Sequence, residues 1–161
     1  MNVFLLHEDP REAARGLVDK HVVKMTTEGV QILNTALHAS GASDLAFYKP
    51  THSNHPWCEW ASESYEQWRL VADYTDAIGW EFIERYGKPH TSHEKMAQFD
   101  VKDISTELGR SGPACPSDTP QTMLDEYKQN NTIEAYRDYY RNEKLTADWA
   151  KYEYTDKPSW L

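Results

Sequence analysis

Four polar residues in the first quarter of the chain have the spacing of one helix face. His21, Lys24, Glu28 and Gln31 follow one another at steps of three, four and three residues, so an α-helix places them one above another. Apolar residues such as Val22 lie beside this face, which predicts that the group sits at the edge of the core. A partly buried carboxylate between a lysine and a histidine can accept or donate a proton. The other interpretation is a solvated face, whose ion pairs contribute about 0.3–0.5 kcal/mol each.

A second polar group precedes an expected helix start at Pro56. It contains Tyr48, Lys49, Thr51, His52, Asn54 and His55. Backbone N–H groups and the helix dipole favour an anion such as phosphate at a helix N-terminus, so we expect substrate contacts here. The alternative is that Asn54 or His55 only caps the helix. His52 and His55 have no third ligand at a suitable spacing, so we expect no metal site.

Further candidates for substrate contact are aromatic or basic. Trp57, Trp60 and Tyr48 offer surfaces on which a base held outside its stack could lie. Lys88 and His90 follow the second expected helix and could contact a phosphate, or they could belong to an ordinary loop and helix cap.

The elements that must position these residues are helical. Apolar periodicity and terminal signals predict an all-α, mainly helical single domain over residues 1–161, with three to four helices and a short extended arm or strand at residues 2–6. The expected helices span residues 10–39, 56–86, 92–108 and 131–152. A segment rich in proline and glycine at about 109–121 is expected to form a loop.

Composition limits the class of protein. The chain has 161 residues, 26 acidic against 17 basic side chains and a formal net charge of −9, which argues against a generic binder of duplex DNA but leaves room for a local basic cleft. Cys58 and Cys115 fit neither a zinc site nor a disulfide framework. The apolar run at residues 3–6 is too short for a signal peptide or a membrane span, so we expect a cytoplasmic protein without a membrane partner.

The segment from Leu17 to Glu28 resembles the first catalytic helix of the phage pyrimidine-dimer DNA glycosylases of the endonuclease V type. In that family an Asp-x-His element is followed, seven residues after the histidine, by the catalytic glutamate. Asp19, His21 and Glu28 have this spacing.

The start and end of the second expected helix carry a further likeness. Asn54-His55-Pro56 with Trp60, leading to Arg85-Tyr86-Gly87, is similar to a pattern in distant and mostly uncharacterised phage relatives of that family. The resemblance covers about residues 1–90 and would place the protein in the cytoplasm of a bacterial host.

The resemblance implies a reaction. Enzymes of that family use the N-terminal α-amine as the nucleophile at the sugar C1′ and form a Schiff base, with no cofactor. Glu28 would then be the acid/base and electrostatic stabiliser, with His21 and Lys24 as supports and Met1 at the nucleophile position. The family carries a small second residue after removal of methionine, whereas this chain has Asn2. The nucleophile is therefore the amine of Met1, Lys24, or neither, in which case no covalent step occurs.

The resemblance also limits the substrate. The neighbours of Glu28 are Thr26, Thr27 and Gly29, which cannot clamp phosphates, so a nucleotide or a modified, flipped or single-stranded base is easier to accommodate than continuous duplex. The expected substrate-binding residues are Asp19, Gln31, Tyr48, Thr51, Asn54, His55, Trp60, Arg85, Lys88 and His90.

Two other functions remain open at this point. The chain could be a non-catalytic acidic phage accessory protein that binds and inhibits a host protein. It could also bind or hydrolyse nucleotides, although it has neither a P-loop nor a helix with paired metal-binding carboxylates.

Overall fold

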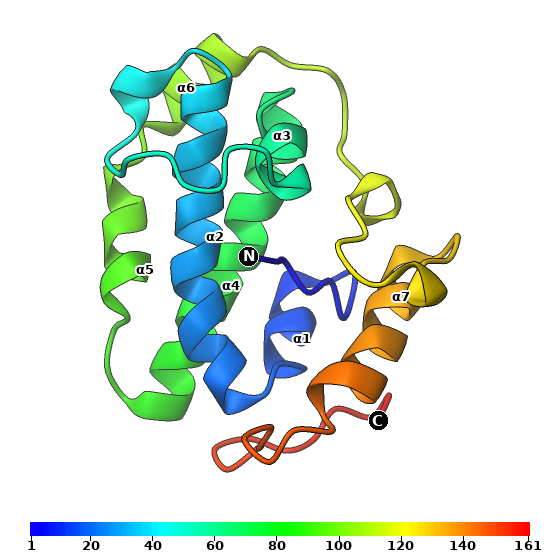
Figure 1. Cartoon of the computed structure of the whole chain (residues 1–161). Helices are drawn as coiled ribbons and strands as arrows, with labels where there is room; N and C mark the ends of the chain where they lie inside the picture. The colour runs from blue at the N-terminus through cyan, green and yellow to red at the C-terminus, as the bar shows by residue number, and fades with distance from the viewer.

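Two long antiparallel helices form the centre of the structure, a computed structural model that describes residues 1–161. α2 (Asp19–Ala39) packs against α4 (Tyr65–Tyr86), and the shorter helices and the C-terminal segment surround this pair (Figure 1). The remaining helices are α1 (Pro10–Arg15), α3 (Pro56–Ala61), α5 (Thr91–Lys95), α6 (Val101–Leu108) and α7 (Thr132–Tyr139), with a π-helical turn at Tyr140–Lys144. None of these helices has the length and apolar character that crossing a membrane requires.

The all-α fold is confirmed and residues 1–6 form an arm with neither helix nor strand, but the expected number of helices is wrong. There are seven α-helices rather than three to four, because short extended segments divide the expected ones. The helix expected at 10–39 is broken at Val18, where the guanidinium of Arg85 donates hydrogen bonds to the carbonyls of Arg15 and Leu17. The helix expected at 56–86 is broken before Ser64, whose hydroxyl caps α4.

The two C-terminal predictions are divided in the same way. Asp100 is extended and caps α6, which separates α6 from α5 within the helix expected at 92–108. α7 begins after its Asn131 cap, as the capping pattern predicts, but regular α-helix ends at Tyr139 rather than near Tyr152. The segment 109–121 contains only one short 3₁₀ turn, at Pro116–Asp118.

The close approach of α2 and α4 depends on a glycine. A Cβ atom built at Gly29 would lie 2.2 Å from Oγ1 and 2.7 Å from Cγ2 of Thr75 on α4. One end of the same interface is fixed by Trp68, whose indole N–H donates to the carbonyl of Leu33 over 3.2 Å. Gly29 therefore sets the distance between the helix that carries Glu28 and its main neighbour.

Gly29→Ala should destabilise the fold although alanine favours helices. Alanine gains about 1 kcal/mol in helix propensity, but overpacking of this kind typically costs about 1–3 kcal/mol and the overlap with Thr75 is severe. We expect a net loss of about 1–2 kcal/mol in the free energy of unfolding, measured by urea denaturation. The loss should shrink in a Thr75→Ala background, since that change removes the two overlapping atoms. Equal losses in both backgrounds would contradict this account of the interface.

Candidate functional site

The N-terminal arm brings the first amine of the chain to Glu28. The α-amine nitrogen of Met1 lies 3.9 Å from Glu28 Oε2, and the backbone N–H of Asn2 donates to the same oxygen over 3.1 Å. Lys24 Nζ contacts the other carboxylate oxygen at 3.2 Å. The Glu28 side chain is only 13% exposed, so these contacts replace much of its water. One carboxylate therefore faces two primary amines, one from the arm and one from its own helix.

Asn2 fixes the position of the arm. Its side-chain oxygen accepts hydrogen bonds from the Thr122 hydroxyl at 2.6 Å and the Trp57 indole N–H at 3.3 Å, and the Tyr136 hydroxyl lies 3.2 Å away. Its amide nitrogen donates to the carbonyl of Thr122 over 3.1 Å. Three separate segments thus hold a residue that is only 9% exposed: α3, the loop before α7, and α7 itself. Asn2 supports the geometry of the amine, and sequence reasoning treated it only as an obstacle to methionine removal.

His55 lies on the other side of Met1. Its Nδ1 accepts from the backbone N–H of Trp57 over 3.3 Å and so caps α3, while the ring also hydrogen-bonds the backbone of Met1. Burial, and next the positive charge of the terminal amine, lower the pKa of His55 below its ordinary value. The capping interpretation of this residue is therefore confirmed, and its contact with the substrate stays a prediction.

Cys58 and Thr35 are neighbours of the amine that the sequence did not single out. Burial raises the pKa of the Cys58 thiol to about 11, and the terminal amine and a hydrogen bond to Thr35 only partly offset that effect. A thiol with such a pKa is protonated at neutral pH and is a poor nucleophile. The signal for Thr35 was present in the sequence, since it lies seven residues after Glu28 and so on the same helix face.

His21 does not lie beside Glu28, which corrects the expectation for it. Its ring stacks on Phe4 at 4.9 Å between centroids, and its Nδ1 lies 2.8 Å from the Tyr140 hydroxyl. That hydroxyl oxygen also accepts the N–H of Val18 over 2.9 Å, and its contact with His21 is compatible with either neutral tautomer of the imidazole. Burial, and next the charges of two lysines, lower the pKa of His21 to about 3. His21 is a residue of the core.

Asp19 and Arg85 are likewise structural rather than free for substrate. Arg85 Nη1 contacts Asp19 Oδ1 at 2.9 Å and Arg85 Nε contacts Glu81 Oε1 at 2.7 Å, with the arginine side chain 1% exposed. The second oxygen of Asp19 accepts the backbone N–H of Glu153 over 2.7 Å. The ion pair of Asp19 and Arg85 joins the α1–α2 junction to α4 and to the C-terminal tail.

Two residues of the loop before α3 lie against α2. The backbone N–H of Thr51 donates to the Thr35 hydroxyl over 3.0 Å, and the Thr51 carbonyl accepts from that hydroxyl over 3.1 Å. The backbone N–H of Tyr48 donates to the side chain of Asn34 over 2.9 Å, and the tyrosine ring lies 4.8 Å from Lys95 Nζ. The face of the Tyr48 ring is therefore already in contact with the ammonium group of Lys95.

The other expected contact residues are dispersed. Trp60 packs edge-on against Trp57 and lines a separate cavity, while Asn54 and Lys88 are exposed. His90 caps α5 by accepting the Ser92 N–H over 3.1 Å, and burial lowers its pKa. Gln31 is half-buried one turn beyond Glu28. Of the expected set, Met1, Lys24, Glu28 and His55 come together.

A groove of about 770 Å³ borders Lys24 and is formed by α2 and the C-terminal tail. Its walls combine three lysines, three acidic residues and two exposed aromatic rings: Lys20, Lys24, Lys151, Asp19, Asp148, Glu153, Trp149 and Tyr154. Lys20 Nζ lies 5.7 Å from the centre of the Trp149 ring, and both Trp149 and Tyr154 are largely exposed for aromatic residues. We call this cavity the tail groove. Sequence reasoning missed it because the tail was expected to be helical as far as Tyr152.

A metal centre has no support in the geometry. No group of three histidine, cysteine, aspartate or glutamate side chains lies close enough together to hold an ion.

The burial of neutral His21 predicts a loss of stability in mild acid. The unfolded chain takes up a proton below about pH 6.5, whereas the folded chain resists protonation until about pH 3, so stability present above pH 6.5 falls as the pH falls toward 3. By pH 5 this residue alone should lower the free energy of unfolding by about 2 kcal/mol. His21→Asn should remove that pH dependence in urea denaturation, and the exposed-site control His52→Asn should retain it. Identical pH profiles for wild type and His21→Asn would contradict the assignment.

Comparison of the chain with protein-family models, with curated proteins and with solved structures found no match. Function must therefore be argued from the chain's own residues. The candidate site consists of the Met1 α-amine and Lys24, which contact the largely buried Glu28. It lies beside a groove lined by lysines, acidic residues and aromatic rings.

Proposed function

We propose that the protein is an enzyme acting at the glycosidic carbon of a nucleotide or a nucleic-acid base, with Glu28 as acid/base and the Met1 α-amine as nucleophile. The observation that carries the proposal is the 3.9 Å approach of this amine to Glu28. An N-terminal amine at a half-buried carboxylate suits amine-based covalent catalysis, because the carboxylate can accept the ammonium proton and then stabilise a cationic intermediate. The resemblance of residues 17–28 to the pyrimidine-dimer glycosylases also implies that Glu28 and the N-terminal amine act together.

The proposed reaction has two steps, attack of the amine at C1′ and opening of the sugar ring. The lone pair of the neutral amine forms a bond to C1′, while the base leaves with the electrons of its bond to C1′ and takes up a proton. Opening of the C1′–O4′ bond transfers one proton from nitrogen to O4′ and leaves an iminium ion. Glu28 accepts the first ammonium proton and faces the positive charge that develops at C1′.

The neighbouring residues have supporting roles in this proposal. Lys24 contacts the second oxygen of Glu28, so it positions the carboxylate and is also the alternative nucleophile. His55 contacts the Met1 backbone, and its lowered pKa keeps it neutral beside the amine at neutral pH. Asn2 orients the arm through its four polar contacts.

The tail groove favours a single-stranded or flipped nucleotide as the substrate. Lysines at its rim can contact phosphates, and Trp149 and Tyr154 offer faces on which a base can stack, a combination found where single strands bind. Lys24 belongs both to this groove and to the Glu28 contact, so a strand in the groove would pass the amine.

Glu28→Gln should abolish the reaction while preserving the fold. The amide oxygen of glutamine can still accept the Asn2 N–H, but it cannot take up the ammonium proton. With a single-stranded oligonucleotide containing one abasic site, we expect strand cleavage to fall about 100-fold or more, and the melting curve to change little. The exposed control Glu107→Gln should cleave like wild type. A folded Glu28→Gln variant with full activity would refute the role of Glu28.

Substitution of groove lysines should weaken binding of a single strand while the fold is preserved. Lys20→Ala and Lys151→Ala should each reduce affinity for an oligothymidylate, and should flatten the plot of log affinity against log salt by about 0.7 for each phosphate that the variant no longer neutralises. Fluorescence anisotropy at several salt concentrations provides the measurement. Lys128→Ala, which removes a lysine paired with Asp125 elsewhere on the surface, is the matched control. An unchanged salt slope in both groove variants would place the strand elsewhere.

A further inference from the structure

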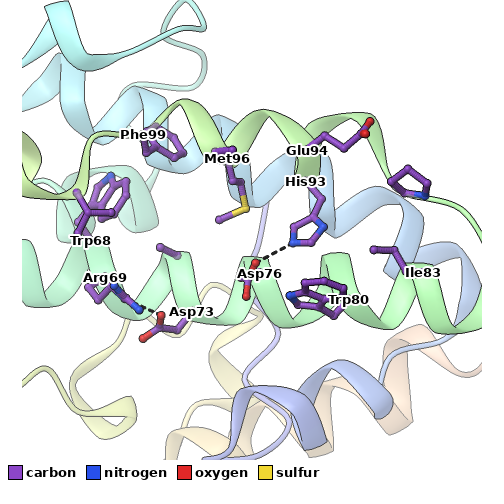
Figure 2. A pocket seen from close by; sticks show the side chains of 14 residues that line it. Trp68, Arg69, Asp73, Asp76, Trp80, Ile83, His93, Glu94, Met96 and Phe99 are labelled. Atoms are coloured by element: carbon purple, nitrogen blue, oxygen red, sulfur yellow. Dashed lines mark hydrogen bonds and ion pairs between the residues drawn. The ribbon is translucent and has the colours of Figure 1, made fainter.

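A second groove lies between α4 and the segment that contains α5, away from the N-terminal site. It has a volume of about 490 Å³, which is within the range of small-molecule sites. Figure 2 shows α4 along one side and residues 93–99 along the other, with side chains from both converging on the space between them. Neither Met1 nor Glu28 lines this groove, and nothing in the proposed reaction uses it.

One end of the groove is apolar. Trp68 and Phe99 are buried and meet edge-on, with 5.1 Å between ring centres. Met96, half-buried, points toward α4 beside them (Figure 2). A thioether beside two aromatic rings suits a ring or short alkyl body rather than a charged group.

The other end combines carboxylates with an exposed indole. Asp73 and Asp76 lie one helical turn apart on α4, and their side chains are 47% and 53% exposed. Trp80 follows Asp76 by one further turn on the same side of the helix and is 55% exposed, an unusual exposure for tryptophan. Glu94 borders the groove from α5, with its carboxylate directed away from α4 (Figure 2).

The carboxylates are only partly neutralised by the protein. Arg69 Nε contacts one oxygen of Asp73 at 2.6 Å, and His93 Nε2 contacts one oxygen of Asp76 at 2.7 Å. Two carboxylates, each about half exposed, therefore face the groove against one arginine and one histidine, on a chain whose formal net charge is −9. A phosphate or another anion would be repelled here, whereas a cation would be attracted and could also contact the face of Trp80.

The position of His93 keeps the groove open. A Cβ atom at Gly79 would fall 2.2 Å from the imidazole carbons of His93, so only glycine at that position lets the ring lie against α4 and reach Asp76. The ring meets Trp80 edge-on at 5.6 Å between centres, which holds the indole at the mouth of the groove. The acidic end is thus fixed by packing.

We propose that this groove binds a small organic cation with an apolar body, of the arylalkylammonium class. The body occupies the end formed by Trp68, Met96 and Phe99, and the ammonium group lies between Asp76 and the indole of Trp80. Asp76 lies eight residues beyond Trp68, about 12 Å along the axis of α4, which leaves space for a ring and a short linker between the two ends.

A series of three probes of similar shape tests the proposal on the full chain. 3-Phenylpropylammonium is the cation, 3-phenylpropanol the neutral analogue and 4-phenylbutyrate the anion. Chemical shifts of ¹³C-methyl-labelled methionines report the location, because Met96 lines the groove while Met1 lies at the N-terminal site. We expect saturable shifts at Met96 and not at Met1, with the cation binding at least about tenfold more tightly than the anion.

Two variants test the acidic end. Asp76→Asn keeps an oxygen that can accept from His93 but removes the charge, and Trp80→Leu removes the aromatic face at an exposed site, so both should fold. Each should weaken binding of the cation about three- to fivefold and leave binding of the neutral analogue unchanged, while the exposed control Asp44→Asn should change neither. Equal affinities for all three probes, shifts at Met1 instead of Met96, or no saturation would overturn the proposal.

Discussion

The hydrogen bonds of Asn2 determine where the first amine of the chain lies. A buried amide without partners costs roughly 1–3 kcal/mol per unmade bond, so Asn2 is stable in its site only when Trp57, Thr122 and Tyr136 are all in place. These partners come from α3, from the loop before α7 and from α7. The position of the Met1 amine is thus set by residues more than fifty positions away in the sequence. The contact between this amine and Glu28 therefore exists only in the folded chain.

The carboxylate that contacts this amine is positioned by a different set of contacts, those of helix α2. Glu28 belongs to α2, whose distance from α4 is set by Gly29, and whose start is held by the buried contacts among Asp19, Glu81 and Arg85. Those same contacts hold the backbone of Glu153 and therefore one wall of the tail groove. A buried charge network of this kind gives little net stability but is costly to break, which suits a role in positioning. Both halves of the candidate site are thus held by contacts within the chain itself.

The sequence predicted the helical class and the positions of several helix ends, because periodicity and capping patterns are local properties that survive folding. The role of Glu28 stays a prediction. It did not predict that His21 points inward, because helical spacing assigns a residue to a side of the helix but not to a partner. The stack on Phe4 and the contact with Tyr140 depend on α7 and the arm. The break at Val18 was missed for a similar reason. In a continuous helix the carbonyls of Arg15 and Leu17 would accept N–H groups of the next turn, whereas here they accept hydrogen bonds from the distant Arg85 guanidinium. The tail groove arises from irregular chain, for which no periodicity exists.

The chemical identity of the nucleophile tests the central claim most directly. Incubating the protein with a single-stranded abasic oligonucleotide in the presence of cyanoborohydride would reduce any iminium to a stable secondary amine, and peptide mass spectrometry would locate it. The account predicts one adduct, on the α-amine of Met1, which lies 3.9 Å from Glu28. An adduct only on Lys24, or no adduct under conditions in which the strand is cleaved, would contradict it.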